Sequence, residues 1–104
     1  MAYERRAHLS WAIHPGEILK EEFLEPMRIS GYALAKAIGV NAQRVSDIIL
    51  EKTGVSADMA IMLGKFFRTS PEFWMNLQSA YELNHAEKSL RQKIKKIKPH
   101  TAAA

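Results

Sequence analysis

Three polar side chains on one short segment, Gln43, Arg44 and Asp47, are the residues of this sequence best suited to chemical recognition. Arginine can donate two hydrogen bonds to guanine O6 and N7, glutamine can pair with adenine in the same way, and aspartate can accept from cytosine N4. If the apolar residues of a helix over 42–50 face inward, Gln43 and Asp47 point outward, and Arg44 and Ser46 lie on the flanks. The pattern favours contact with the base edges of DNA. An ordinary helical hairpin with a solvated polar face is the alternative.

The segment 32–50 must position these side chains, and its pattern predicts two short helices joined by a tight turn. Gly39 ends the first helix, because glycine adopts the left-handed conformation of a helix C-terminus without a Cβ clash. Ser30 and Asn41 cap the two helices by accepting hydrogen bonds from free backbone N–H groups. The inward faces are apolar: Leu34, Ala35, Ile38, Val45, Ile48 and Ile49. The segment is therefore predicted to form a helix-turn-helix.

An earlier helix is expected to begin at Pro15 and to be stopped by Pro26 at about 24–25, because proline lacks an N–H and clashes with the preceding turn. Met27 and Ile29 in the following connection are expected to pack inward. The outer face of this helix is acidic, which favours a solvated surface or a basic partner protein rather than DNA. Its acidic residues are Glu17, Glu21, Glu22 and Glu25.

Two later helices are predicted. Ser56 caps a helix that ends near Phe67, and Asp58 suits the dipole of its first turn. Ser70 and Pro71 start the last helix, which is expected to reach about Ile97. The helix that follows Ser56 is expected to contribute five residues to the core of the domain: Met59, Ala60, Leu63, Phe66 and Phe67.

An apolar stripe continues along the last helix into the basic end of the chain: Leu83, Ala86, Leu90, Ile94 and Ile97. Such a stripe beyond a compact body predicts a dimer seam or a contact with another subunit, and a frayed tail is the alternative. The seam is favoured for residues 81–90, while the role of 91–104 stays open. Trp11, in the N-terminal arm, is expected to pack on the domain or to offer an arm to another chain.

Length and composition indicate a single folded domain: 104 residues, 47% hydrophobic, without cysteine. The missing cysteines exclude disulfides and thiolate zinc sites. No apolar run approaches the ~20 residues of a membrane span, and no apolar segment follows Arg5 and Arg6 as a secretory signal requires. We therefore expect a cytoplasmic protein that makes no membrane contact.

The net charge of +4 lies in the tail. Residues 1–86 contain nine Lys or Arg and ten Asp or Glu, whereas residues 87–104 contain six Lys or Arg and one Glu. A basic tail can attract phosphate or an acidic partner without sequence specificity, and it can equally serve to keep the terminus soluble.

Four stretches resemble HigA-type antitoxins of the lambda-repressor-like (XRE) helix-turn-helix family: HPGEILKEEFLEP at 14–26, LAKAIGVNAQRVSDII at 34–49, VSADMAIMLGKFF at 55–67 and TSPEFWMNLQSAYEL at 69–83. Their combination is far more specific than the turn alone. The resemblance implies an all-α, five-helix lambda-repressor-like helix-turn-helix bundle over residues 14–90 with an extended C-terminal helix. An N-terminal arm (1–13) and a basic C-terminal tail (91–104) flank this DNA-binding domain.

The resemblance also implies a homodimer, which represses its own operon by binding an inverted repeat of double-stranded operator DNA. The apolar stripe described above predicts that this homodimer forms through the C-terminal helix. The implied protein partner is a small basic HigB-type toxin of the RelE class, which cuts mRNA at the ribosome and is inhibited when bound. The arm and first helix, or the acidic face, are the candidate toxin surfaces. A stand-alone XRE regulator without a toxin is the alternative; an adjacent gene for a small, very basic protein would separate the two.

Carried over position by position, the recognition helix starts at Asn41 or Ala42. Asp47 either accepts from cytosine or orients Arg44. Family members often carry Asn-Gly and a basic pair where this chain has 50–53, so Glu51 and Thr53 predict weaker phosphate contact here. The assigned DNA-binding residues are Asn41, Gln43, Arg44, Ser46 and Asp47, with Lys36, Lys52 and Thr53 as phosphate contacts.

An enzyme is not expected. The four histidines are scattered, no HExxH pair occurs, and the acidic cluster of the first helix has no loop that could hold a cation. The sequence therefore predicts no catalytic residue, no metal site and no cofactor.

Overall fold

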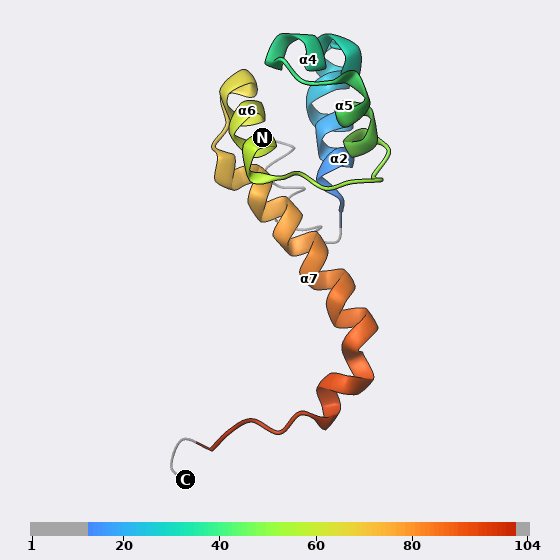
Figure 1. The fold of residues 1–104 in the computed structure, drawn as a ribbon, viewed down its shortest axis with the longest axis vertical. Coiled ribbons are helices and arrows are strands. Elements are labelled where there is room, and N and C mark those ends of the chain that lie inside the picture. Colours follow the sequence, from blue (N-terminus) through green and yellow to red (C-terminus); the bar gives the residue numbers. More distant parts are fainter. Residues whose placement is uncertain (1–12, 102–104) are drawn as a thin grey trace.

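The computed structural model describes residues 13–101, and this range forms five helical segments and no strand (Figure 1). The first is a continuous run of α2 (Pro15–Ile18), the π-helical η1 (Leu19–Leu24) and α3 (Glu25–Met27). The others are α4 (Gly31–Ile38), α5 (Ala42–Ile49), α6 (Ala57–Phe67) and α7 (Pro71–Lys96). The predicted all-α, five-helix bundle with an extended last helix is confirmed. Trp11 and the rest of the arm lie outside the described residues, except Ile13.

His14 caps the first helical run, because its Nδ1 accepts a hydrogen bond from the Gly16 N–H at 2.8 Å. The side chain is buried, and this desolvation lowers the pKa of His14 below its ordinary 6.5. Folding therefore favours the neutral ring. The resulting contribution to stability is present above pH 6.5 and is lost as the pH falls below it, because the unfolded chain then binds the proton more readily.

The prediction that Pro26 stops the first helix at 24–25 is wrong, because the helical backbone continues to Met27. The π-helical turn ahead of the proline explains this. The Glu25 N–H bonds to the Lys20 carbonyl, five residues back, and this wider turn makes room for the proline ring. The run ends at Arg28, which adopts the left-handed conformation with φ of 56°.

Aromatic side chains form the centre of the core. Trp74 of α7 is fully buried and its ring centroid lies 5.1 Å from that of Phe23, which in turn lies 4.8 Å from Phe67. The indole N–H of Trp74 donates to the Thr69 hydroxyl at 2.8 Å, so the buried polar atom is satisfied. Burial of Met59, Ala60, Leu63 and Phe67 is confirmed.

Two predicted core positions are wrong. Phe66 lies on the outer side of α6, because its neighbour Phe67 takes the inward direction. Met27 is exposed because the helix extends to include it, and only Ile29 packs against the core from this connection.

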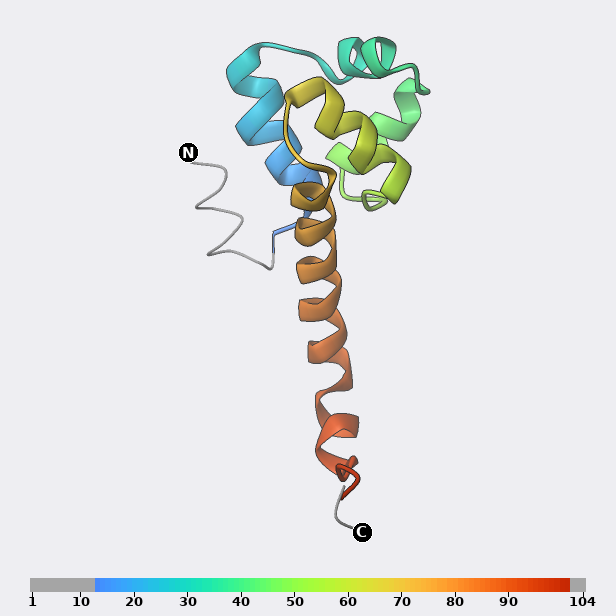
Figure 2. The same ribbon diagram turned by 90° about the vertical axis from the view of Figure 1, so that its left-hand side faces the viewer.

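The last helix is much longer than the bundle needs, and Figure 2 shows α7 projecting from it. The buried residues of α7 lie in its first half, and all described residues from 85 to 101 are exposed. The exposed part carries the apolar stripe without a covering element in the described chain. No described helix is both long and apolar enough to cross a membrane.

Candidate nucleic-acid interface

The helix-turn-helix forms as predicted from local signals. Gly39 follows α4 in the left-handed conformation with φ of 76°. Ser30 caps α4 by accepting from the Ala33 N–H at 3.0 Å, and Asn41 caps α5 by accepting from the Gln43 N–H at 2.7 Å. Val45 and Ile48 are buried, so the opposite side of α5 faces outward.

A surface hollow of about 450 Å³ lies along the outward side of α5. Residues from α5, from the loop after it and from the cap of α6 contribute to it, so segments separate in the sequence meet here. Four of the predicted DNA-binding residues from the hairpin line this hollow, together with Thr53 from the loop. The complete lining is Asn41, Gln43, Arg44, Asp47, Ile48, Thr53, Gly54 and Ser56.

Gln43 and Asp47 form a pair on successive turns of α5, because the Gln43 amide Nε2 donates to the Asp47 carboxylate at 2.8 Å. Arg44 turns toward the N-terminus of α6 instead. Its Nη2 lies 2.8 Å from both carboxylate oxygens of Asp58 and 3.0 Å from the Ser56 hydroxyl. In this structure Asp47 therefore pairs with Gln43, and Arg44 is oriented by residues of α6.

Ser56 stands at the predicted N-cap of α6, but its hydroxyl makes no capping bond. The hydroxyl instead donates to the Asp58 carboxylate and accepts from Arg44. The bond from Ser56, followed by that from Arg44, lowers the pKa of Asp58 from 3.8 to about 2. Because folding lowers this pKa, the stabilisation is present above pH 3.8 and is lost as the pH falls toward about 2.

Three of the predicted residues, Lys36, Ser46 and Lys52, do not line the hollow. Lys36 is exposed in the last turn of α4, Ser46 is half-buried on α5, and Lys52 and Thr53 are exposed in the following loop. The backbone N–H groups of Lys52 and Thr53 both bond to the Asp47 carbonyl, at 2.8 and 3.3 Å. The loop is thereby tied to the end of the recognition helix.

The same loop is anchored to α7 by Gln78, which sequence reasoning missed. Its buried amide oxygen accepts from the Val55 N–H at 2.7 Å, and its Nε2 donates to Glu82 at 2.5 Å. A Cβ at Gly54 would overlap this amide, so glycine permits the close approach. Sequence reasoning also missed the pairing of Arg44 with Asp58. The residues Ser-Ala-Asp at 56–58 indicated the start of a helix, but nothing in the sequence indicated a contact with Arg44.

Glu51 adopts the left-handed conformation with φ of 63°, a region that favours glycine. This conformation costs a residue with a side chain about 1–2 kcal/mol, and glycine avoids that strain. Glycine also makes the unfolded chain more flexible, and this offsets part of the gain in stability. Replacing Glu51 by glycine should therefore raise the free energy of unfolding by about 0.5–1 kcal/mol in thermal or urea unfolding. Glu51→Ala removes the same charge but keeps the Cβ. An equal gain in both variants would assign the effect to charge and contradict the backbone explanation.

Known proteins match most of this chain. Antitoxin HigA-1 from Vibrio cholerae is 44% identical over 85 residues, which is 81% of this chain and 79% of that protein. The structure of the antitoxin HigA of Pseudomonas aeruginosa with the higBA promoter superposes with a TM-score of 0.83 at 52% identity, covering 86% of this chain and 99% of that one. The chain belongs to the HigA antitoxin family.

A second HigA-like structure, antitoxin GraA in complex with its operator, superposes with a TM-score of 0.81 at 47% identity, covering 86% of this chain and 92% of GraA. No protein-family model matches the chain. The resemblance drawn from the four sequence stretches is confirmed. HigA proteins are helix-turn-helix transcriptional regulators and antitoxins, and the chain is accordingly a regulator and not an enzyme.

Proposed function

We propose that this HigA-family protein is an antitoxin and transcriptional autorepressor that inserts α5 into the major groove of its own operator. The observation that carries the proposal is the polar hollow on α5, in which Gln43, Arg44 and Asp47 lie together. Its support includes two HigA-like structures bound to promoter or operator DNA. A helix of this kind presents its first turns to base edges while neighbouring segments contact the backbone.

The outward residues of α5 divide into roles. Gln43 and Asp47 share a hydrogen bond, so the amide is oriented before DNA arrives. Arg44 supplies donors for guanine, and Gln43 suits adenine. Asn41 uses its side-chain oxygen in the cap, which leaves its NH₂ group for a contact with DNA. Ser46 lies at the edge of this group on α5.

Lys36, Lys52 and Thr53 are proposed to contact phosphates, because they are exposed on α4 and on the loop after α5, the segments that flank the recognition helix in the chain. Lys52→Ala should weaken binding to all DNA sequences alike and reduce the slope of log affinity against log salt by about one. Affinity titrations at several salt concentrations, with operator and unrelated duplexes, measure both effects. A loss confined to the operator would contradict the assignment.

The exposed half of α7 is proposed to form the homodimer, because Leu83, Leu90 and Ile94 are exposed at helical spacing although they are large and apolar. An isolated helix of this length is marginal in water, so a partner helix would stabilise it.

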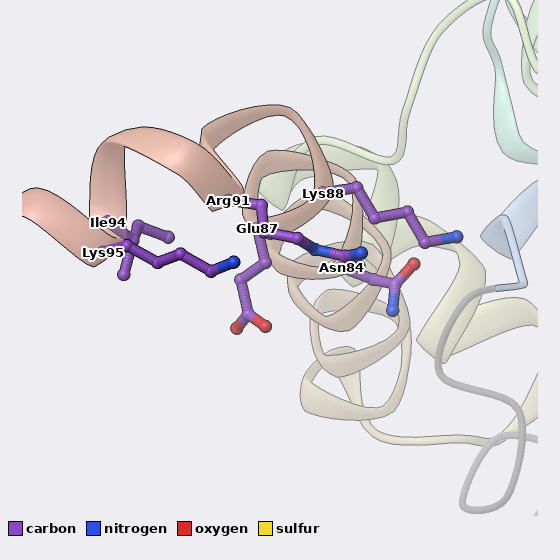
Figure 3. A pocket seen from close by; sticks show the side chains of 6 residues that line it. All are labelled: Asn84, Glu87, Lys88, Arg91, Ile94 and Lys95. Atoms are coloured by element: carbon purple, nitrogen blue, oxygen red, sulfur yellow. The ribbon is translucent and has the colours of Figure 1, made fainter.

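Figure 3 shows six side chains around a hollow on this half: Asn84, Glu87, Lys88, Arg91, Ile94 and Lys95. A dimer would present two α5 helices about 34 Å apart, one turn of DNA. Sedimentation equilibrium of the free protein tests this, and a monomer at micromolar concentration would contradict it.

A HigB-type toxin is the proposed protein partner, bound in the cytoplasm through the N-terminal arm and the first helix. The acidic outer face of that helix, with Glu21 and Glu25 exposed, suits a basic protein. Deleting residues 1–13 and testing co-purification with the product of the neighbouring gene would show whether the arm is needed to bind the toxin. Retention of the toxin by the shortened chain would exclude the arm.

A gel shift on the promoter upstream of the gene, with and without the co-expressed neighbouring protein, tests the whole proposal. Binding of that promoter, together with co-purification of a small basic protein, is the expected result. Promoter binding without such a partner would favour the second candidate, a stand-alone XRE-family regulator. The absence of sequence-preferring binding would reject both.

A further inference from the structure

Arg44 is held by a group on a different helix. Both carboxylate oxygens of Asp58, in the first turn of α6, lie 2.8 Å from its Nη2, and the Ser56 hydroxyl lies 3.0 Å from the same nitrogen. The arginine and aspartate side chains are 40% and 63% exposed, so the pair lies at the surface rather than in the core. Surface ion pairs contribute little to stability, and a purely structural role is a weak explanation for this one.

The geometry leaves part of the guanidinium available. All hydrogen bonds from the Arg44 side chain to the described residues use Nη2, so Nε and Nη1 keep their N–H donors for another acceptor. Arg44 also lines the hollow beside Gln43 and Asp47, which is where base edges would approach in the proposed complex. Ser56 and Asp58 therefore hold the Arg44 side chain in place and leave part of its guanidinium free to donate hydrogen bonds to DNA.

We infer that Asp58 is a positioning residue for DNA recognition: it fixes the Arg44 side chain in advance, and thereby sets the preference for one base pair. The inference rests on the proposed function. A free arginine has many side-chain rotamers, and ordering it on binding costs affinity. Asp58 and Ser56 order it in the folded protein, so this cost does not fall on the DNA complex.

The charge of Asp58 makes the inference specific. An exposed carboxylate beside DNA repels phosphates, so an aspartate without a positioning role would lower affinity for every duplex. A residue that orients Arg44 raises binding to the correct duplex more than to others. Selectivity, rather than affinity alone, is therefore the quantity that distinguishes the two roles.

The test uses the full-length protein and a promoter duplex, together with a set of duplexes carrying single base-pair changes. Arg44→Ala first locates the base pair at which the wild-type preference depends on Arg44. Asp58→Asn should then reduce the preference for that base pair by roughly five- to tenfold, the size expected for releasing one ordered side chain. Adding Asp58→Asn to Arg44→Ala should change the preference no further.

Glu72→Gln is the matched control, because it removes one exposed carboxylate at the start of α7, beyond the opposite end of α6. It should leave the base-pair preference unchanged. Ser56→Ala, which removes the hydroxyl that touches both partners, should lower the preference in the same direction as Asp58→Asn. Thermal unfolding of each variant verifies that it is folded.

The outcomes separate the inference from the function on which it rests. If Arg44→Ala reduces the preference and Asp58→Asn does not, the positioning role is wrong and the proposed recognition by Arg44 stands. If Asp58→Asn binds all duplexes more tightly by one common factor, Asp58 acts only by repulsion and the inference is overturned. If Arg44→Ala itself has no effect, the assignment of Arg44 to base recognition fails, and the positioning role of Asp58 fails with it.

Discussion

Arg44→Ala is expected to weaken operator binding by roughly 5- to 150-fold, corresponding to the ~1–3 kcal/mol that a base-specific arginine contact contributes. The physical reason is that the hollow of α5 loses its one cationic donor, while the neighbouring Gln43–Asp47 pair stays intact. The loss should concentrate at one base pair, whose identity the variant no longer distinguishes. Titration of fluorescent duplexes with systematic base-pair changes measures both quantities.

The control for this prediction is Lys65→Ala, which removes one exposed cation near the far end of α6. It should alter affinity only slightly and equally for all duplexes. Operator affinity and base preference that are unchanged in Arg44→Ala would disprove the assignment of Arg44 to base recognition, and would leave Gln43 and Asp47 as candidates on the outward side of α5.

Gly16→Ala is expected to destabilise the fold by about 3 kcal/mol, near the upper end of the usual overpacking penalty. A Cβ at Gly16 would overlap the carbonyl oxygen of Ile48, a backbone atom of the recognition helix. A backbone atom cannot move aside by a rotamer change, so α2 and α5 would have to separate. Urea unfolding gives the loss of free energy directly, and operator titration should show weakened binding from the displaced α5.

Gly31→Ala provides the contrast at the start of α4. There a Cβ would approach two side-chain atoms, Cδ1 of Ile49 at 3.1 Å and Cγ1 of Val45 at 3.5 Å. The first is the end of a flexible side chain that can adjust, and the second is at an ordinary van der Waals distance. This substitution should change the free energy of unfolding by less than about 1 kcal/mol, since alanine also favours the helix. Equal stability of the two variants would contradict the close packing of α2 on α5.

Local signals were the most predictable part of this protein. Ser30, Asn41 and Ser70 cap their helices as expected, and Gly39 ends α4 in the left-handed conformation. Each of these features depends on atoms two to four residues apart, so nearby sequence is sufficient to specify it. Helical periodicity located the buried residues of α5 in the same way.

The errors arose where a local rule competed with packing or with an alternative hydrogen bond. Pro26 would end an ordinary α-helix, but a π-helical turn accommodates it. Ser56 occupies a cap position, yet an aspartate two residues later and an arginine from α5 offer its hydroxyl stronger, charged partners. Sequence periodicity carries no information about which of these competitors has the lower energy.

The sequence by itself determined the all-α class, the hairpin with its caps, the polar outward side of α5 and the family. These follow from chain-local chemistry and from motifs whose combination is specific. Only the tertiary structure decided that Arg44 meets Asp58, fourteen positions along the chain, and that Gln78 of α7 holds the loop after α5. Those contacts depend on how separate helices cross, and the crossing is set by the packing of the whole core rather than by any one segment.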